Sequence, residues 1–261
     1  MEQVLETIVA KSREELAESR KRIPASLLES RIPELPPVRD FAAALRRPGR
    51  RIIAELKAAS PSKGAIRPEL DREVERLAAG LDAAGAAALS VLTERNFFLG
   101  SGMNLRRARG SVDIPLLRKD FIYDEYQILE ARVWGADAIL LIAAMLTPEE
   151  FRKLRAFAAS LGLAVLCEAH TADELDMLLD GGAEIVGINA RNLSTFDTSL
   201  ALAGELIRQI PAGKIAVAES AIRSADDLNA MEQLGAKAFL IGETLMRAER
   251  PGEKLCELLS K

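Results

Sequence analysis

The apolar residues from Arg51 onward fall into short runs that are separated by longer amphipathic segments. The runs are strand candidates and cover residues 51–57, 86–93, 114–120, 136–144, 163–169, 183–190, 214–220 and 236–243. Each run is hydrophobic at nearly every position, as strands buried on both faces must be, whereas a one-sided antiparallel sheet alternates apolar with polar residues. The pattern therefore predicts eight parallel strands.

The segments between these runs predict helices. Three of them begin with a capping residue and acidic residues in the first turn, at residues 147–150, 171–174 and 224–227. A glycine suited to end a helix precedes every second strand, at Gly85, Gly135, Gly182 and Gly235. Eight strand–helix units favour a closed barrel over a doubly wound sheet, which has a glycine-rich first turn. We therefore predict an α/β fold, a single (β/α)8 TIM barrel.

The first 48 residues precede this alternation and differ from it. Residues 3–20 carry an apolar stripe at helical spacing, formed by Val4, Leu5, Ile8, Val9 and Leu16. The proline-rich stretch that follows, from Pro24 to Pro48, predicts a loop with short helical turns. We expect a helical extension of about 45 residues (1–48), a barrel (49–261) and one domain over residues 1–261, since such barrels reach about 250 residues.

Charge and composition narrow the classes of partner. The 35 basic and 39 acidic side chains give a net charge of −4, so no overall field attracts nucleic acid or an anionic membrane. The N-terminal residues carry charges at every turn and lack a continuous apolar run, which excludes a signal peptide or a membrane span there. We expect a cytoplasmic protein that is a monomer or a weak homo-oligomer.

Cysteine and histidine are scarce. Cys167 and Cys256 are far apart and lack CxxC spacing, so neither a disulfide framework nor a zinc site is expected, and both are interpreted as small buried hydrophobes. His170 is the single histidine, which excludes a multi-histidine metal site. It is interpreted as a surface or loop residue, with a catalytic role as the alternative.

Polar residues gather where the predicted strands end, which is where barrels of this type carry their chemistry. Glu55 and Lys57 face the same way because strand side chains alternate with a period of two. The later strands end in Lys119, Asp120, Glu168, Asn189, Arg191, Glu219 and Ser220, and the last leads into Gly242. Each alone fits a solvated charge or a structural ion pair. Together, two lysines and three carboxylates around one mouth predict acid–base chemistry on a small anionic substrate.

Seven segments in order resemble the indole-3-glycerol phosphate synthase family. The most specific is IIAELKAASPSKGAIRPE at 52–69, and the others are TERNFFLGS (93–101), LLRKDFI (116–122), LCEAH (166–170), VGINARNL (186–193), AESAI (218–222) and FLIGETLM (239–246). The resemblance spans the whole chain, including the helical extension. It implies a carboxy-lyase of tryptophan biosynthesis that uses no metal or organic cofactor. The family cyclises 1-(2-carboxyphenylamino)-1-deoxyribulose 5-phosphate to indole-3-glycerol phosphate with loss of carbon dioxide and water.

The resemblance also implies catalytic roles. Lys119 matches the general acid that protonates the substrate carbonyl oxygen, and Glu168 matches the carboxylate that handles protons during dehydration. Lys57 matches a lysine near the substrate carboxylate and phosphate, and how the two lysines divide acid duty stays open. Glu55 is expected to orient both lysines by charge pairing.

Further residues are expected to hold the substrate. Asn189 and Ser220 match groups that hydrogen-bond its reacting portion, with Glu219 in support. Arg191 is placed to meet the anthranilate carboxylate, a planar anion that suits a guanidinium. The aromatic ring is expected in an apolar pocket, although each of these residues also fits ordinary core: Phe98, Phe121, Leu140, Ile142, Pro61 and Leu193. Ser60 lies beside Pro61 in a loop, residues 58–67, that is interpreted as a lid or an ordinary surface loop.

The phosphate is expected on backbone N–H groups after the seventh and eighth strands, at Ala221, Gly242 and Glu243. The chain departs from the family at Ala221, where a glycine usually follows the Glu-Ser pair. A Cβ there has a cost if the position needs a positive φ or a close approach of the phosphate.

Two other functions are the alternatives. Phosphoribosylanthranilate isomerase, a related barrel, uses a cysteine near the end of strand one and an aspartate near strand seven, whereas this chain has Glu55 and Lys57 at the first position and Glu219 at the second. A non-catalytic phosphate-binding barrel would keep the glycine-containing cradle but has no need for Lys119 or Glu168, and both are present.

Overall fold

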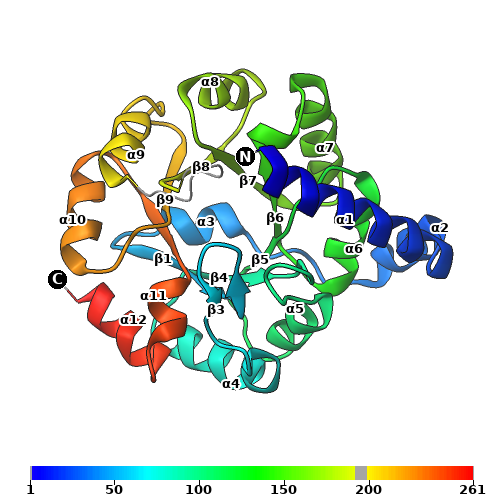
Figure 1. The fold of residues 1–261 in the computed structure, drawn as a ribbon, viewed down its shortest axis with the longest axis horizontal. Coiled ribbons are helices and arrows are strands. Elements are labelled where there is room, and N and C mark those ends of the chain that lie inside the picture. Colours follow the sequence, from blue (N-terminus) through cyan, green and yellow to red (C-terminus); the bar gives the residue numbers. More distant parts are fainter. Residues whose placement is uncertain (1, 192–198, 261) are drawn as a thin grey trace.

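The computed structural model of the protein describes residues 2–191 and 199–260. Eight parallel strands close into a barrel, in which β1 pairs with both β4 and β10 (Figure 1). The strands are β1 (Arg51–Leu56), β4 (Ala88–Leu92), β5 (Leu116–Lys119), β6 (Ala138–Ile142), β7 (Ala164–Ala169), β8 (Ile185–Asn189), β9 (Ile215–Glu219) and β10 (Ala238–Ile241). Each lies inside one of the predicted runs, so the predicted TIM barrel is confirmed.

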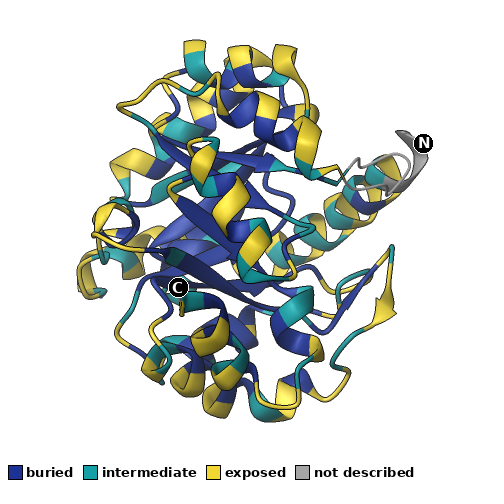
Figure 2. Cartoon of the chain, turned by 90° about the vertical axis from the view of Figure 1, so that its left-hand side faces the viewer, coloured by how far each residue is buried: buried dark blue, intermediate teal, exposed yellow. Residues whose placement is uncertain are grey.

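Helices surround the barrel and turn their exposed faces outward, while the strands are buried (Figure 2). They are α4 (Leu70–Ala83), α5 (Gly102–Arg109), α6 (Glu125–Trp134), the 3-10 helix η2 (Ala143–Met145), α7 (Pro148–Ser160), α8 (Ala172–Asp180), α9 (Leu200–Ile207), α10 (Ala225–Gln233), α11 (Glu243–Arg247) and α12 (Pro251–Leu259). In the described ranges no helix is both long and apolar enough to cross a bilayer.

The predicted helix boundaries have the expected chemistry. Thr147, Thr171 and Ser224 each cap a helix by accepting a backbone N–H with their side chain. The four glycines that precede every second strand all have a positive φ, as the left-handed end of a helix requires. Local sequence signals therefore set the direction of the strand–helix units.

Alternate residues of each strand point into the barrel and form a separate apolar core. This core contains Ile53, Leu117, Leu166 and Val217, one from each of four strands. Phe41 and Leu45 of α3 (Phe41–Arg46) join it and are almost fully buried, since α3 lies across the amino-terminal end of the barrel. Apolar packing seals this end, so the cavity of the molecule opens at the other one.

The extension runs from one end of the barrel to the other. It consists of α1 (Glu2–Arg22), α2 (Ala25–Arg31), η1 (Ile32–Glu34) and α3. The helix α1 passes over the β6 side of the barrel (Figure 1) and is tied to the β5–α6 loop, where the hydroxyl of Tyr123 donates to Ser12 at 3.3 Å and Arg20 pairs with Asp124. The predicted helix and short helical turns are present, and α1 reaches the carboxyl-terminal end of the barrel.

Candidate active site

A cavity of about 600 Å³ opens at the carboxyl-terminal ends of the strands. Every predicted site residue that the structure describes lines it. They are Glu55, Lys57, Ser60, Pro61, Phe98, Lys119, Phe121, Leu140, Ile142, Glu168, Asn189, Arg191, Glu219, Ser220, Ala221, Gly242 and Glu243. The predicted pocket residue Leu193 falls outside the described residues. Side chains predicted from eight separate strand ends thus face one space.

Lys119 lies at the centre of the polar side of this cavity. Its Nζ is 2.9 Å from Oε2 of Glu168 and 3.3 Å from Oε2 of Glu219. The three residues come from β5, β7 and β9 and point inward by the alternation of strand side chains. Both carboxylates are almost fully buried, whereas the lysine side chain keeps 14% exposure on the cavity side. The Lys119 ammonium therefore contacts two carboxylates and is still accessible from the cavity.

Burial and the charges of the neighbouring groups determine which residues of this cluster are protonated. Burial alone favours neutral Lys119, but Glu168, Glu219 and Glu55 together raise its pKa above the ordinary value. Burial opposes ionisation of Glu168 as well, yet Lys119 and His170 hold its pKa well below the usual range. Burial and the neighbouring Glu168 charge raise the pKa of Glu219 to about 8. At neutral pH an ammonium, a carboxylate and a neutral carboxylic acid are in contact, which supplies both a proton donor and an acceptor.

A second lysine–carboxylate pair lies on β1. Nζ of Lys57 is 2.6 Å from Oε1 of Glu55, and Ser90 on β4 donates to the other Glu55 oxygen at 3.4 Å. Glu55 thus pairs with Lys57, while it acts through its charge on Lys119, which lies two strands away. A Cβ on Gly242 would lie 2.3 Å from Oε1 of Glu55. Gly242, predicted for the phosphate, therefore also leaves room for this pair.

Asn189 links Glu168 to the ends of β8 and β9. Its Nδ2 donates to Oε1 of Glu168 at 3.2 Å, and its Oδ1 accepts from the Ser220 hydroxyl at 2.7 Å and from the Arg191 N–H at 3.0 Å. Ser220 and Ala221 have φ values of 65° and 60°. The position where the family usually has glycine is thus left-handed here, a conformation that disfavours the Cβ of Ala221.

The opposite wall of the cavity is apolar. The rings of Phe98 and Phe121 lie 5.9 Å apart, and Leu140 and Ile142 of β6 complete the predicted pocket. Leu5 and Ile8 of α1 also line the cavity. The sequence revealed their stripe as a helix face but carried no signal for what that face covers, because the contact joins segments about 90 residues or more apart.

Cations gather at the rim near β9 and β10. Arg223, Thr244 and Arg247 line the cavity there and were missed in the sequence. Glu243 accepts from Nε of Arg247 at 2.9 Å and lies 3.9 Å from Arg191. Arg247 follows Glu243 by four residues, and this helical spacing could have predicted their ion pair. Arg223 lies in the loop after β9, where no such spacing rule applies.

The loop residues Ser60 and Pro61 lie at the mouth. They belong to a small antiparallel hairpin of β2 (Ala59–Ser60) and β3 (Gly64–Ala65), which extends the end of β1. Lys63 at its tip lines the cavity. Burial opposes ionisation of Glu243, but the hydrogen bond from Arg247 and the charge of Lys63 lower its pKa. The predicted loop therefore has regular structure and brings a further cation to the rim.

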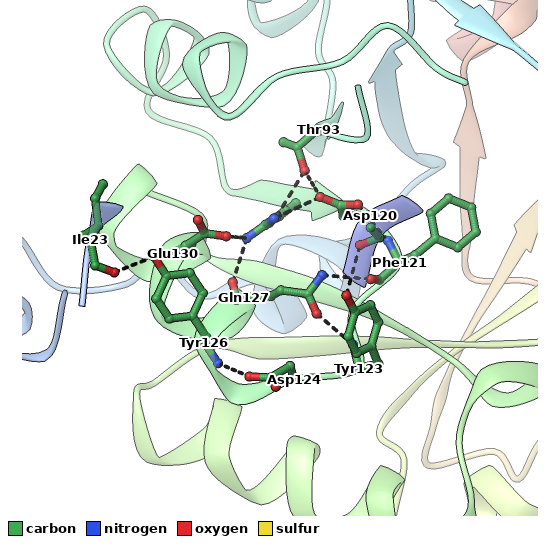
Figure 3. A network of polar contacts seen from close by, with 11 residues as sticks. Ile23, Thr93, Asp120, Phe121, Tyr123, Asp124, Tyr126, Gln127 and Glu130 are labelled. Carbon is green, nitrogen blue, oxygen red and sulfur yellow. Dashed lines mark hydrogen bonds and ion pairs between the residues drawn. The ribbon is translucent and has the colours of Figure 1, made fainter. Parts of the chain in front are cut away.

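A buried polar network behind β5 holds the loop that carries Phe121. Arg118 points away from the cavity and donates to Asp120 at 2.9 Å and to the Gln127 carbonyl at 2.6 Å. Asp120 accepts the N–H of Phe121, and the Gln127 amide donates to the Phe121 carbonyl, both at 2.9 Å (Figure 3). Arg118 also donates to Glu130 at 3.4 Å. Arg118 and Gln127, which do not belong to the cavity wall, thus hold the two residues that follow Lys119.

Comparisons with solved structures agree with this fold. The tryptophan synthase alpha chain of Legionella pneumophila superposes with a TM-score of 0.63 at 13% identity, covering 84% of this chain and 95% of that one. A 3-hexulose-6-phosphate synthase superposes with a TM-score of 0.65 at 12% identity, covering 80% and 98%. At such identities the likeness establishes the barrel and nothing about its chemistry.

Sequence comparisons are more specific. A sequence model described as indole-3-glycerol phosphate synthase matches residues 5–258. The chain is 44% identical over 266 residues to the indole-3-glycerol phosphate synthase of Dechloromonas aromatica, with all of both chains covered. It is 46% identical over 265 residues to that of Burkholderia ambifaria, with 99% of each covered. The chain belongs to the indole-3-glycerol phosphate synthase family.

Proposed function

We propose that the protein closes the indole ring of 1-(2-carboxyphenylamino)-1-deoxyribulose 5-phosphate to give indole-3-glycerol phosphate, carbon dioxide and water, as a carboxy-lyase of tryptophan biosynthesis. The observation that carries the proposal is Lys119, which contacts Glu168 and Glu219 at the floor of a cavity that is apolar on one side and cationic on the other. An aryl group and an anionic chain in one substrate fit these two sides.

The proton balance of the reaction fits the cluster. The oxygen that leaves as water receives two protons and the neighbouring carbon gives up one, so an ionised substrate takes up one proton per turnover. The Lys119 ammonium is proposed to protonate the carbonyl oxygen as the ring carbon attacks, because its charge also stabilises the oxygen as negative charge develops. The Glu168 carboxylate, ionised in its pair with Lys119, is proposed to handle the protons of dehydration.

The remaining polar residues are proposed to position the substrate. Asn189 and Ser220 hydrogen-bond the reacting portion, with Glu219 in support, and Arg191 meets the aryl carboxylate. Lys57, held by Glu55 at 2.6 Å, is proposed to serve the carboxylate and the phosphate of the substrate. Lys57 and Lys119 both face the cavity, so either of them can serve the second protonation.

The aromatic ring is proposed to bind the apolar wall, and the phosphate the N–H groups of Ala221, Gly242 and Glu243. Glu243 is a carboxylate among the cations of this rim, so a bound phosphate competes with it for Arg247 and Lys63. Loop residues Ser60 and Pro61 close over the ligand in this scheme.

We further propose that residues 1–261 form one domain that works in the cytoplasm as a monomer or weak homo-oligomer, on a small phosphorylated substrate. No metal or organic cofactor is needed, because side chains of the protein supply the proton donor and acceptor. Light scattering should give the mass of the oligomer, and urea should unfold the chain in one transition. Extended dialysis against EDTA should leave turnover intact, and restoration by a divalent ion of lost activity would contradict this part.

The activity itself is tested by incubating purified protein with the carboxyphenylamino substrate and recording indole fluorescence together with released carbon dioxide. The expected result is equal amounts of indole product and carbon dioxide. The matched control is the phenylamino analogue without the carboxyl group, which has no carbon dioxide to lose and should give none. Absence of indole from the true substrate, with folded protein, would overturn the proposed function.

A further inference from the structure

His170, the single histidine of the chain, lies in the turn between β7 and α8. It is a loop residue, as interpreted from the sequence, but its side chain is only 10% exposed. The ring lies between two carboxylates: Nε2 is 3.3 Å from Oε1 of Glu168 and Nδ1 is 3.3 Å from Oε2 of Glu174. A buried imidazole placed in this way is favoured in its doubly protonated form.

Glu174 fixes the outer side of the ring. Its Oε2 accepts the backbone N–H of His170 at 2.7 Å, and its own N–H donates to the capping hydroxyl of Thr171 at 3.2 Å. The carboxylate lies in the first turn of α8, where the helix dipole stabilises negative charge. Glu174, at the start of α8, therefore contacts both the backbone N–H and the ring of His170.

The equivalent carboxylate of α7 has no such ring. Glu150 accepts the N–H and the hydroxyl of its own capping residue, Thr147, at 2.8 and 2.9 Å. Both helices begin with a threonine hydroxyl that accepts the N–H of a glutamate three residues later. Glu150 bonds back to its own capping residue, whereas Glu174 bonds to His170, whose ring links the first turn of α8 to Glu168. The cap alone does not account for His170.

The inner side of the ring faces the catalytic cluster through Glu168. Oε2 of Glu168 accepts from Lys119 at 2.9 Å, whereas Oε1 faces His170 and accepts from Asn189 at 3.2 Å. Among the described residues His170 is not part of the cavity wall. It touches the carboxylate from behind and leaves the other oxygen for chemistry.

We propose that His170 is a positioning residue whose imidazolium, held by Glu174, keeps Glu168 ionised and oriented toward Lys119. The proposal rests on the proposed function and assigns the histidine no contact with substrate. It also balances the buried charges. With neutral Glu219, the cations Lys119 and His170 match the anions Glu168 and Glu174.

The groups that face the ring account for its charge. They are Glu168 from β7 and Glu174 from α8, with Lys119 of β5 and Glu219 of β9 beyond Glu168. Burial opposes the charged ring, but the two carboxylates in contact with its nitrogens raise the pKa of His170 to about 9. At neutral pH the ring is therefore an imidazolium.

Proton NMR tests this directly, because tag-free protein contains one histidine and gives one ring Cε1–H titration. We expect a midpoint near pH 9 in the wild type. Glu174→Gln, which still accepts the backbone N–H but is uncharged, should lower it by about one pH unit or more. A wild-type midpoint near the ordinary value of about 6.5 would overturn the proposal. This readout needs no turnover, so it stands apart from the proposed function.

Kinetics then separate positioning from simple stability. His170→Gln removes the charge that holds Glu168 toward Lys119, and it should lower kcat about tenfold with little change in KM, since small displacements of catalytic groups are costly. Glu150→Gln removes the matched carboxylate of α7 and should leave kcat unchanged. Wild-type kcat in folded His170→Gln, or equal losses in the two variants, would overturn the positioning role. If His170→Gln fails to fold, the NMR titration decides.

Discussion

The two ends of the barrel both bury carboxylates but satisfy them differently. At the amino-terminal end Asp137 accepts three hydrogen bonds of 2.8 Å, from the N–H groups of Arg39 and Leu116 and from the guanidinium of Arg109. At the mouth Glu219 shares Lys119 with Glu168, and its Oε1 has no hydrogen-bond partner among the described residues. Hydrogen bonds to both oxygens fix Asp137 within the fold, whereas one oxygen of Glu219 is unpaired within the described part of the chain. We expect this difference to separate carboxyl groups that build the fold from carboxyl groups that do chemistry.

The largest expected effect is at the mouth. Lys119→Met should lower kcat by at least about two orders of magnitude, the usual scale for a lost general acid, with a smaller change in KM. Steady-state assays of folded protein measure this, and activity near wild type would remove Lys119 from the mechanism. Lys57→Met, on the matched lysine of β1, resolves how acid duty is divided. A loss as large as that of Lys119→Met would show that both lysines are required.

Asp137→Asn tests the other end of the barrel. The amide keeps one acceptor oxygen but places a donor against Leu116 or Arg109, so we expect a loss of about 2 kcal/mol in the free energy of unfolding. Urea denaturation measures it. kcat should stay within about twofold of wild type, because Asp137 lies at the end opposite the cavity. A variant of normal stability with reduced kcat would reverse the assignment of the two ends.

The sequence was sufficient to predict the inward pairs because strand geometry alone determines them. Glu55 and Lys57 are two residues apart on one strand, and Lys119, Glu168 and Glu219 each end a buried run, so alternation and closure bring them together. Strand alternation can therefore be read from the sequence without knowledge of the side-chain contacts.

What the sequence missed depends on contacts between distant segments or on exact side-chain geometry. The apolar stripe of α1 predicted a helix, but nothing in it specified that Leu5 and Ile8 reach the cavity. His170 was interpreted as a surface or loop residue because its burial depends on where Glu168 and the first turn of α8 meet. Gly242 was predicted as a phosphate-binding residue. Only the structure shows that a side chain at this position would also collide with Glu55.

Gly187→Ala perturbs the mouth without removing a charge. A Cβ at this β8 position would lie 2.0 Å from Oε1 of Glu219, so the carboxylate must move away from Lys119. We expect kcat to fall about tenfold, since small displacements of catalytic groups are costly. The control is Gly213→Ala, on an exposed loop where an added Cβ has nothing within 4 Å. Equal kcat in both variants would mean that Glu219 tolerates displacement.

Ala221→Gly is the smallest change and acts on the backbone of the mouth. Ala221 has a φ of 60°, in the left-handed region that glycine enters without the strain of a Cβ. Removing this strain is partly offset by the greater freedom of glycine in the unfolded chain, so we expect a gain of about 0.5–1 kcal/mol in the free energy of unfolding.

The matched control for that gain is Ala248→Gly, because Ala248 is also partly exposed but has a φ of −68°. There glycine brings no relief, so urea denaturation should show a small loss of stability. Ala221→Gly should also lower KM for the phosphorylated substrate, since the N–H groups after β9 can approach a phosphate more closely without the Cβ. A stability loss of the same size in both variants would mean that the left-handed backbone at Ala221 is not strained. An unchanged KM would place the phosphate elsewhere on the rim.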